Sequence, residues 1–208
     1  MLKENDFVEI DYVARIKDDG IFDLTIEDVA KRENIYDPET KYKPVVICIG
    51  KGDIIRGLDN FLIGKEIGKK YAVEISPEEG FGKKDKNLIK LVPTGEFTKQ
   101  NVKPVPGMHL NMGGIMGKII SVTGGRTLVD FNNPLSGRDL VYEIEIKRII
   151  NDKKEQLVGL LDLILKDFKL ELNDDEATIT SKIDPELKKK LEKEIRERIK
   201  IGKITFKE

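Results

Sequence analysis

The strongest constraint on the fold is a series of short strand-like segments with few helical segments among them. Residues 7–13, 71–75 and 140–147 alternate apolar and polar side chains, which is the period of a strand with one buried face. The run 45–49 is continuously apolar and has the length of a strand, whereas the apolar positions in 54–63 recur at helical spacing. This pattern predicts an α+β fold in which an antiparallel sheet wraps on one short helix.

The stretch from 84 to 131 differs in composition from the segments on either side. It holds three of the four methionines of the chain and two Gly-Gly pairs. The second pair, Gly124-Gly125, separates the strand-like segments 119–123 and 126–131, which is typical of a β-hairpin. We therefore predict a small β-rich module at 84–131.

A second change in composition begins near residue 151. Apolar residues at amphipathic helical spacing predict a helix over 157–168, and a strand is predicted at 177–183. Asp184-Pro185 can open a second helix, and 204–206 close the chain as a strand. The result is an αβαβ domain at 151–208. Because its roughly 58 residues are few for independent stability, it is expected to dock on the rest of the chain or on a second copy, which would make a homodimer.

Charge and composition argue against several classes of protein. The net charge is −1, with 37 basic and 38 acidic side chains, so no overall field favours nucleic acid or acidic lipid. No apolar stretch approaches the roughly 20 residues that span a bilayer, and the first residues lack the apolar core of a signal peptide. Cys48 is the only cysteine and His109 the only histidine. We expect a cytoplasmic protein with no nucleic-acid or membrane partner, no cofactor and no metal.

Five motifs stand in a fixed order along the chain. They are Asp11-Tyr12-Val13, Phe22-Asp23, and the segments 49–58, 75–82 and 141–146. In this order they resemble the FK506-binding protein (FKBP) family, and the resemblance covers residues 6–82 and 131–150. The stretch between the last two motifs resembles the insert-in-flap domain of SlyD-like members, and the C-terminal segment looks like that of archaeal long-type members.

The resemblance implies a domain layout and an activity. An isomerase domain would comprise 1–83 and 132–150, an insert-in-flap chaperone domain 84–131, and a C-terminal domain 151–208. The activity would be peptidyl-prolyl cis–trans isomerisation of X-Pro bonds in unfolded or nascent polypeptides. Rotation about a peptide bond has a barrier of about 18–20 kcal/mol. A dry apolar pocket with a few positioned donors can lower it without a nucleophile, metal or cofactor.

The same resemblance implies which residues form the prolyl pocket. Asp23 would lie at the rim and orient Tyr12 or a backbone donor, and the Ile55 amide would donate to the carbonyl before the proline. Leu58 replaces a tryptophan of the best-known members and Phe81 a tyrosine, which lowers the expected affinity for FK506-type macrolides and the expected turnover. The apolar pocket residues are Tyr12, Phe22, Val45, Ile54, Ile55, Leu58, Phe81 and Tyr142.

In the insert, flexible and polarisable methionine suits a surface that binds many clients. The client-binding candidates, each also a candidate for the core of the module, are Ile89, Leu91, Val92, Phe97, Met108, Met112 and Met116. One alternative is a chaperone or peptide-binding module with weak or no turnover, which Leu58 and Phe81 favour. Another is a scaffold or nucleic-acid-associated factor, against which the near-neutral charge argues.

Overall fold

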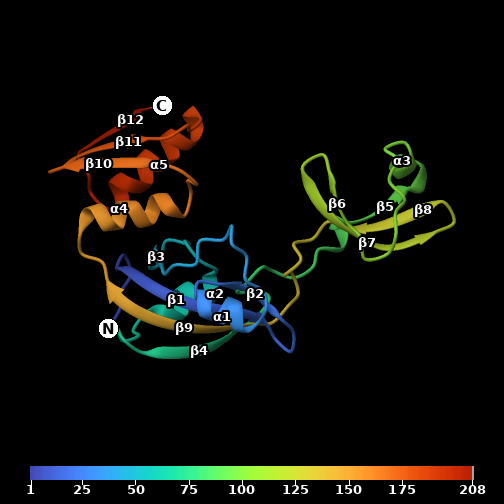
Figure 1. The fold of residues 1–208 in the computed structure, drawn as a ribbon, viewed down its shortest axis with the longest axis horizontal. Helices are drawn as coiled ribbons and strands as arrows, with labels where there is room; N and C mark the ends of the chain where they lie inside the picture. The colour runs from blue at the N-terminus through green and yellow to red at the C-terminus, as the bar shows by residue number, and fades with distance from the viewer. Residues whose placement is uncertain (208) are drawn as a thin grey trace. The chain divides into compact units, whose positions relative to one another are not determined.

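The computed structural model describes residues 1–207 and divides the chain into two compact units (Figure 1). The main unit combines Met1–Ile75 with the chain from Leu140 onward, and the insert unit is Ser76–Asp139. The predicted insert, 84–131, lies inside this second unit, which begins earlier and ends later. The predicted domain boundaries themselves stay a prediction.

The main unit is built on a five-stranded antiparallel sheet. Its strands β2 (Ile21–Leu24), β1 (Phe7–Ile16), β9 (Leu140–Ile149) and β4 (Lys70–Ile75) follow one another, and β3 (Val45–Cys48) also pairs with β1. Strands β1 and β9 are the longest; burial alternates along the first part of β9, whereas β1 also buries the neighbouring pairs Phe7-Val8 and Val13-Ala14. The α+β class expected from the sequence is therefore confirmed.

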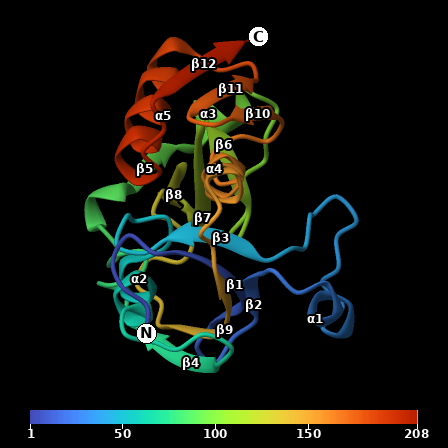
Figure 2. The ribbon, with the colours of Figure 1, turned by 90° about the vertical axis from the view of Figure 1, so that its left-hand side faces the viewer.

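Helix α2 (Arg56–Leu62) covers one face of this sheet near β4 (Figure 2). Its side chains Leu58 and Leu62 are fully buried, and the Phe61 ring meets Tyr71 of β4 edge to face at 5.9 Å. A second short helix, α1 (Glu27–Arg32), follows β2 in the excursion toward β3. The helix α2 is thus the one that the 54–63 pattern predicts.

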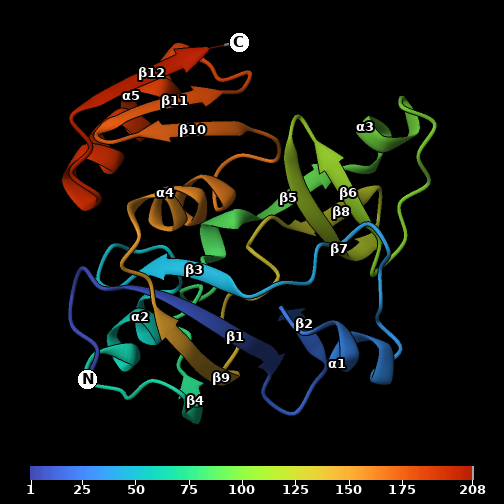
Figure 3. The ribbon, with the colours of Figure 1, turned by 60° about the vertical axis from the view of Figure 1, so that its left-hand side comes forward.

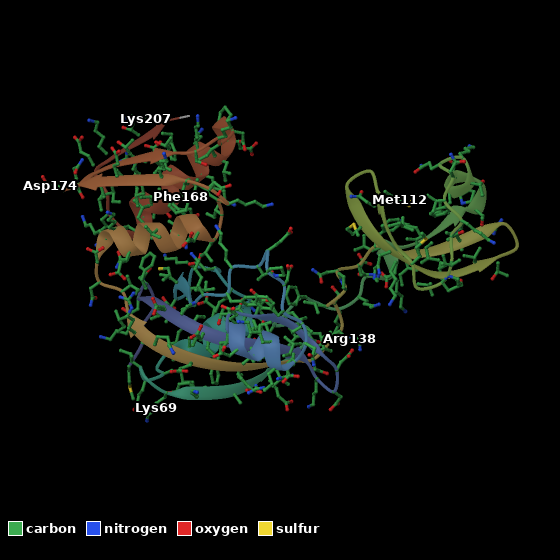
Figure 4. The ribbon with its side chains drawn as sticks, in the orientation of Figure 1. Lys69, Met112, Arg138, Phe168, Asp174 and Lys207 are labelled. Carbon is green, nitrogen blue, oxygen red and sulfur yellow. The ribbon has the colours of Figure 1, made fainter. Side chains whose placement is uncertain are left out.

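The C-terminal segment has one strand more than expected. It runs α4 (Lys153–Asp162), β10 (Lys169–Asn173), β11 (Glu176–Thr180), α5 (Pro185–Arg198) and β12 (Lys203–Lys207), so the order is αββαβ rather than αβαβ. The first helix ends at Asp162, six residues before the predicted end at 168, and the chain then forms β10 and turns at Asp174 (Figure 4). The apolar residues that follow the end of α4 pack into the same core as the helix. In the sequence, their spacing therefore looks like a continuation of the helical pattern.

This segment docks on the rest of its own chain, one of the two predicted outcomes. Helix α4 lies between β3 and the C-terminal sheet (Figure 3), and Gly159 of α4 is so close to Val46 of β3 that an added Cβ would lie 2.5 Å from it. Phe7, Cys48 and Ile150 join the leucines and isoleucines of 151–208 in one core cluster. Burial of apolar surface on both sides therefore makes the C-terminal segment part of the main unit.

The insert unit contains a four-stranded antiparallel sheet. Its strand order is β5 (Ile89–Pro93), β8 (Arg126–Asp130), β7 (Ile115–Thr123) and β6 (His109–Met112). A 3₁₀ turn at Lys86–Leu88 and helix α3 (Thr94–Thr98) flank β5, and the small core is Phe97, Ile119 and Val129.

The β7–β8 hairpin predicted from Gly124-Gly125 is confirmed. Both glycines have positive φ (57° and 76°), as the tight turn requires. Across residues 1–207, no helix is both long and apolar enough to cross a bilayer.

Candidate functional site

Three of the predicted pocket residues form an aromatic cluster on one face of the main sheet. In the β1–β9 register Tyr12 lies opposite Ile144 and Ala14 opposite Tyr142, so the two tyrosine side chains project from the same face. Their ring centroids are 5.8 Å apart at 49°. The Phe22 ring, from β2, meets Tyr142 edge to face at 6.1 Å. Tilted and edge-on contacts of this kind are the favoured arrangement of aromatic rings.

The Tyr12 hydroxyl is held by Asp23. It donates a hydrogen bond of 2.7 Å to Oδ2 of Asp23, whose side chain is exposed at the edge of the cluster. Burial raises the pKa of Tyr12 well above its ordinary value, and the Asp23 carboxylate raises it further. Burial also raises the pKa of Tyr142, to about 12. Both phenols therefore keep their protons throughout the neutral range.

A surface hollow of about 320 Å³ lies beside this cluster. Phe22 and Asp23 line one side, and the excursion between β2 and β3 supplies Ile35, Asp37 and Tyr42 on the other. The segment 24–44 between β2 and β3 thus forms a wall of this hollow next to the aromatic cluster.

The aliphatic pocket candidates of the main unit come from two segments. Val45 pairs with Ile10 in the β1–β3 register, which places it on the face that carries Tyr12. Ile54 and Ile55 are half-buried and directly precede α2, with Ile55 at its N-cap. Within residues 1–207 the Ile55 N–H has no hydrogen-bond acceptor, whereas the Ile55 carbonyl accepts from the first turn of α2. An unpaired amide beside apolar side chains is available to a ligand carbonyl.

Two pocket candidates differ from the others. Leu58 is 1% exposed and lies in the interior of α2, as a core residue does. Phe81 belongs to the insert unit, in a turn where the Gly82 amide donates to the Pro77 carbonyl and the Ser136 hydroxyl to the Phe81 carbonyl. The main unit therefore brings together Tyr12, Phe22, Asp23 and Tyr142, and Phe81 lies on a separate unit.

Two carboxylates that the sequence analysis overlooked shape the turn before α2. The Asp59 carboxylate, 6% exposed, accepts hydrogen bonds from the amides of Gly50 (2.8 Å) and Gly52 (3.1 Å). Asp53 accepts from the Cys48 amide at 2.8 Å. Both glycines have positive φ, so the turn exposes amides that strand pairing cannot satisfy. Acidic residues soon after a Gly-Lys-Gly turn were the available sequence signal.

The client-binding candidates fall into three groups. Leu91 and Met116 are each 56% exposed, whereas Ile89, Val92, Met108 and Met112 are half-buried. Phe97 is 5% exposed and forms the core of the insert unit, so its side chain is not part of any exposed surface. A unit with so small a core needs large aromatic side chains to fill it, and the Phe131 ring packs against the same cluster.

Further exposed apolar residues of this unit were not among the candidates. The most exposed is Ile115, at 59%, which follows the Gly113-Gly114 turn of the β6–β7 hairpin and pairs with Met112 (Figure 4). The remaining ones are Leu88, Val105 and Ile120. Gly-Gly turns carry little side-chain surface, so the apolar residues beside them stay uncovered.

In the part of the chain that the structure describes, no group of three or more His, Cys, Asp or Glu side chains is arranged to hold a metal ion.

Comparison with known proteins adds a family context. Residues 90–135 match the family model described as FKBP26, IF domain. The chain is 36% identical over 149 residues to the short-type peptidyl-prolyl cis-trans isomerase of Methanocaldococcus jannaschii, a match that covers 72% of this chain and 94% of that protein. It is 28% identical over 149 residues to the FKBP-type peptidyl-prolyl cis-trans isomerase SlyD of Haemophilus influenzae, covering 70% of each. The SlyD of Yersinia pestis is 32% identical over 118 residues, which span 55% of this chain and 60% of that protein.

Proposed function

The chain belongs to the FKBP-type peptidyl-prolyl cis–trans isomerases, and from this premise we propose that the aromatic cluster of Tyr12, Phe22 and Tyr142 receives the substrate proline. The protein accelerates cis–trans isomerisation of X-Pro bonds in proline-containing polypeptides. The observation that carries the site is the set of three rings on one sheet face, with the Tyr12 hydroxyl fixed by Asp23 at 2.7 Å.

The geometry suits the chemistry of amide rotation. In the transition state the X-Pro bond is twisted, so its nitrogen and carbonyl are no longer conjugated. An aromatic and aliphatic surround disfavours the more polar planar amide, because it offers that amide no solvation. The unpaired Ile55 amide supplies a donor to the substrate carbonyl. Since such a donor is already in place before the bond twists, it costs no reorganisation during the reaction.

We propose further that the exposed apolar side chains of the insert unit bind unfolded or nascent chains. Ile115 and Met116 are adjacent, more than half exposed, and located at the β6–β7 hairpin. Met116 is also flexible, which suits clients of varied sequence. The proposed location is the cytoplasm, with no nucleic-acid or membrane partner.

The test compares a short proline peptide with a protein whose refolding is limited by proline isomerisation. Tyr142→Ala is expected to reduce turnover of both substrates, because it removes the ring that contacts Tyr12 and Phe22. The pair Ile115→Ser and Met116→Ser is expected to leave the peptide rate within twofold and to slow assisted refolding about tenfold. The tenfold figure corresponds to roughly 1.4 kcal/mol of lost client binding.

A matched control is Ile63→Ser with Ile67→Ser, since these residues are 41% and 43% exposed on the main unit. Equal effects of the two pairs on refolding would contradict the proposed client surface. If the intact protein suppresses aggregation but accelerates neither reaction, the chain is a chaperone without turnover.

We also propose a homodimer through 151–208, on the basis of two exposed apolar residues. Most apolar side chains of this segment are covered by its own chain, but Leu163 and Ile164, just after α4, are 37% and 41% exposed. Light scattering should give twice the monomer mass of 23.6 kDa, and Leu163→Ser with Ile164→Ser should return it to the monomer value. A monomer mass for the unchanged protein would contradict the dimer.

A further inference from the structure

A buried ion pair joins helix α5 to the turn that precedes the pocket isoleucines. Nη1 of Arg198 lies 2.6 Å from Oδ1 of Asp53, and both side chains are 8% exposed. Arg198 also contacts the Lys51 carbonyl at 3.4 Å, while its Nε donates to Glu194 one turn earlier in α5 at 2.7 Å. The guanidinium is thus held by its own helix and presented to residues about 145 positions earlier in the chain.

Asp53 directly precedes the pocket candidates Ile54 and Ile55, so its ion pair with Arg198 can affect their position. Its second oxygen, Oδ2, accepts the Cys48 amide at 2.8 Å, so a single carboxylate links α5 to the end of β3. The next two residues are Ile54 and Ile55, whose amide is the proposed donor to the substrate. Loss of the guanidinium would leave a buried carboxylate with one partner, a strongly unfavourable state. The turn would then rearrange to expose that charge to water.

The C-terminal segment also contacts β3, the strand that begins with Val45, the other aliphatic pocket candidate. Helix α4 packs on β3 through Gly159 and Val46, and Asp162 at its end pairs with Lys43 at 2.6 Å. Val45 lies between these two contact points. The C-terminal segment therefore touches both stretches that supply aliphatic pocket residues, one through α4 and one through α5.

We propose that Arg198 is a positioning residue of the isomerase: through Asp53 it holds the Ile54–Ile55 stretch in the geometry that presents the Ile55 amide to the substrate carbonyl. This inference rests on the proposed function of that stretch. It gives the C-terminal segment an indirect part in catalysis, because the Ile54–Ile55 stretch keeps its geometry only with α5 in place.

The experiment compares Arg198→Met with Arg196→Met in the full-length protein. Arg196 lies on the same helix and pairs with Glu192 at 2.8 Å, but its contacts stay within the C-terminal segment. Arg198→Met is expected to lower kcat/KM for a short proline peptide about tenfold, since displacements near 1 Å at a reacting group can cost even more. Arg196→Met is expected to stay within twofold of the unchanged protein. Arg198→Lys keeps the charge and should restore part of the rate.

A second readout is independent of turnover. In ¹H–¹⁵N spectra, Arg198→Met should shift the amide resonances of 52–55 and speed their hydrogen exchange, whereas Arg196→Met should not. The inference is overturned if the two variants give equal kcat/KM and unchanged 52–55 amides. If the unchanged protein shows no turnover, the proposed function fails, and the amide data alone decide the positioning role. If Arg198→Met does not fold, Arg198→Lys is compared with Arg196→Lys by the same two measurements.

Discussion

The carboxylate of Asp59 offers the sharpest test of what holds the turn before the pocket. In Asp59→Asn one acceptor oxygen becomes an NH₂ group, which cannot accept from the Gly50 or Gly52 amide. One hydrogen bond to a charged group, worth about 1.5–3 kcal/mol, is lost, and the other becomes a neutral bond of about 1 kcal/mol. Both glycines are exposed, so water can reach the freed amide. We expect the free energy of unfolding to fall by about 2 kcal/mol.

The assay is urea unfolding followed by far-ultraviolet circular dichroism. The matched control is Asp184→Asn, because the Asp184 carboxylate also accepts two backbone amides, from Glu186 (3.0 Å) and Leu187 (2.9 Å), at the exposed start of α5. Asparagine caps helices about as well as aspartate, so this variant should lose less than about 1 kcal/mol. Equal losses in the two variants would refute the argument that burial makes the Asp59 contacts strong.

Three further outcomes follow from the packing and the pKa shifts. The raised pKa of Tyr142 means that the folded state holds this proton more tightly than the unfolded state, whose pKa is near 10. Stability should therefore fall as pH rises from 10 toward 12, by about 1 kcal/mol at pH 11, and urea titrations of Tyr142→Phe should show a smaller fall. Gly159→Ala places a Cβ 2.5 Å from Val46 and should cost about 1–3 kcal/mol by urea unfolding, less in a Val46→Ala background. Gly117→Ala meets an aromatic ring and a valine methyl at 2.8 Å and should speed amide exchange in the insert sheet, whereas Gly95→Ala, with no atom within 4 Å, should not.

Residues 151–208 and the rest of the main unit share one apolar core cluster, so the main unit depends on its C-terminal segment. In this protein the apolar residues Phe7, Cys48 and Ile150 are covered by 151–208. Removing that segment would expose much of their surface, because residues 151–208 supply most of the members of this cluster. The segment is thus structural for the main unit, apart from any part in self-association.

Local patterns predicted most of the elements correctly. The alternation at 71–75 and 140–147 became β4 and β9, and the Gly124-Gly125 signal became the β7–β8 hairpin. Strand β10 was missed because the apolar residues after α4 keep helical spacing while they pack into the same core. Phe97 was a candidate for both the client surface and the core of the insert, and the structure buries it; apolar character alone does not tell a core side chain from a binding one.

The sequence by itself determined the α+β class and the hairpin within the insert, because alternation and turn residues are local properties of the chain, while the pocket candidates came from the resemblance of its motifs to those of a known family. Only the tertiary structure decided that the Asp23 carboxylate holds the Tyr12 hydroxyl and that Asp59 closes the Gly50–Gly52 turn. Only the tertiary structure places Arg198 beside Asp53, which lies 145 residues earlier in the chain. Such pairings depend on which polar groups meet once the apolar surfaces have packed. A local sequence pattern cannot predict which groups these are.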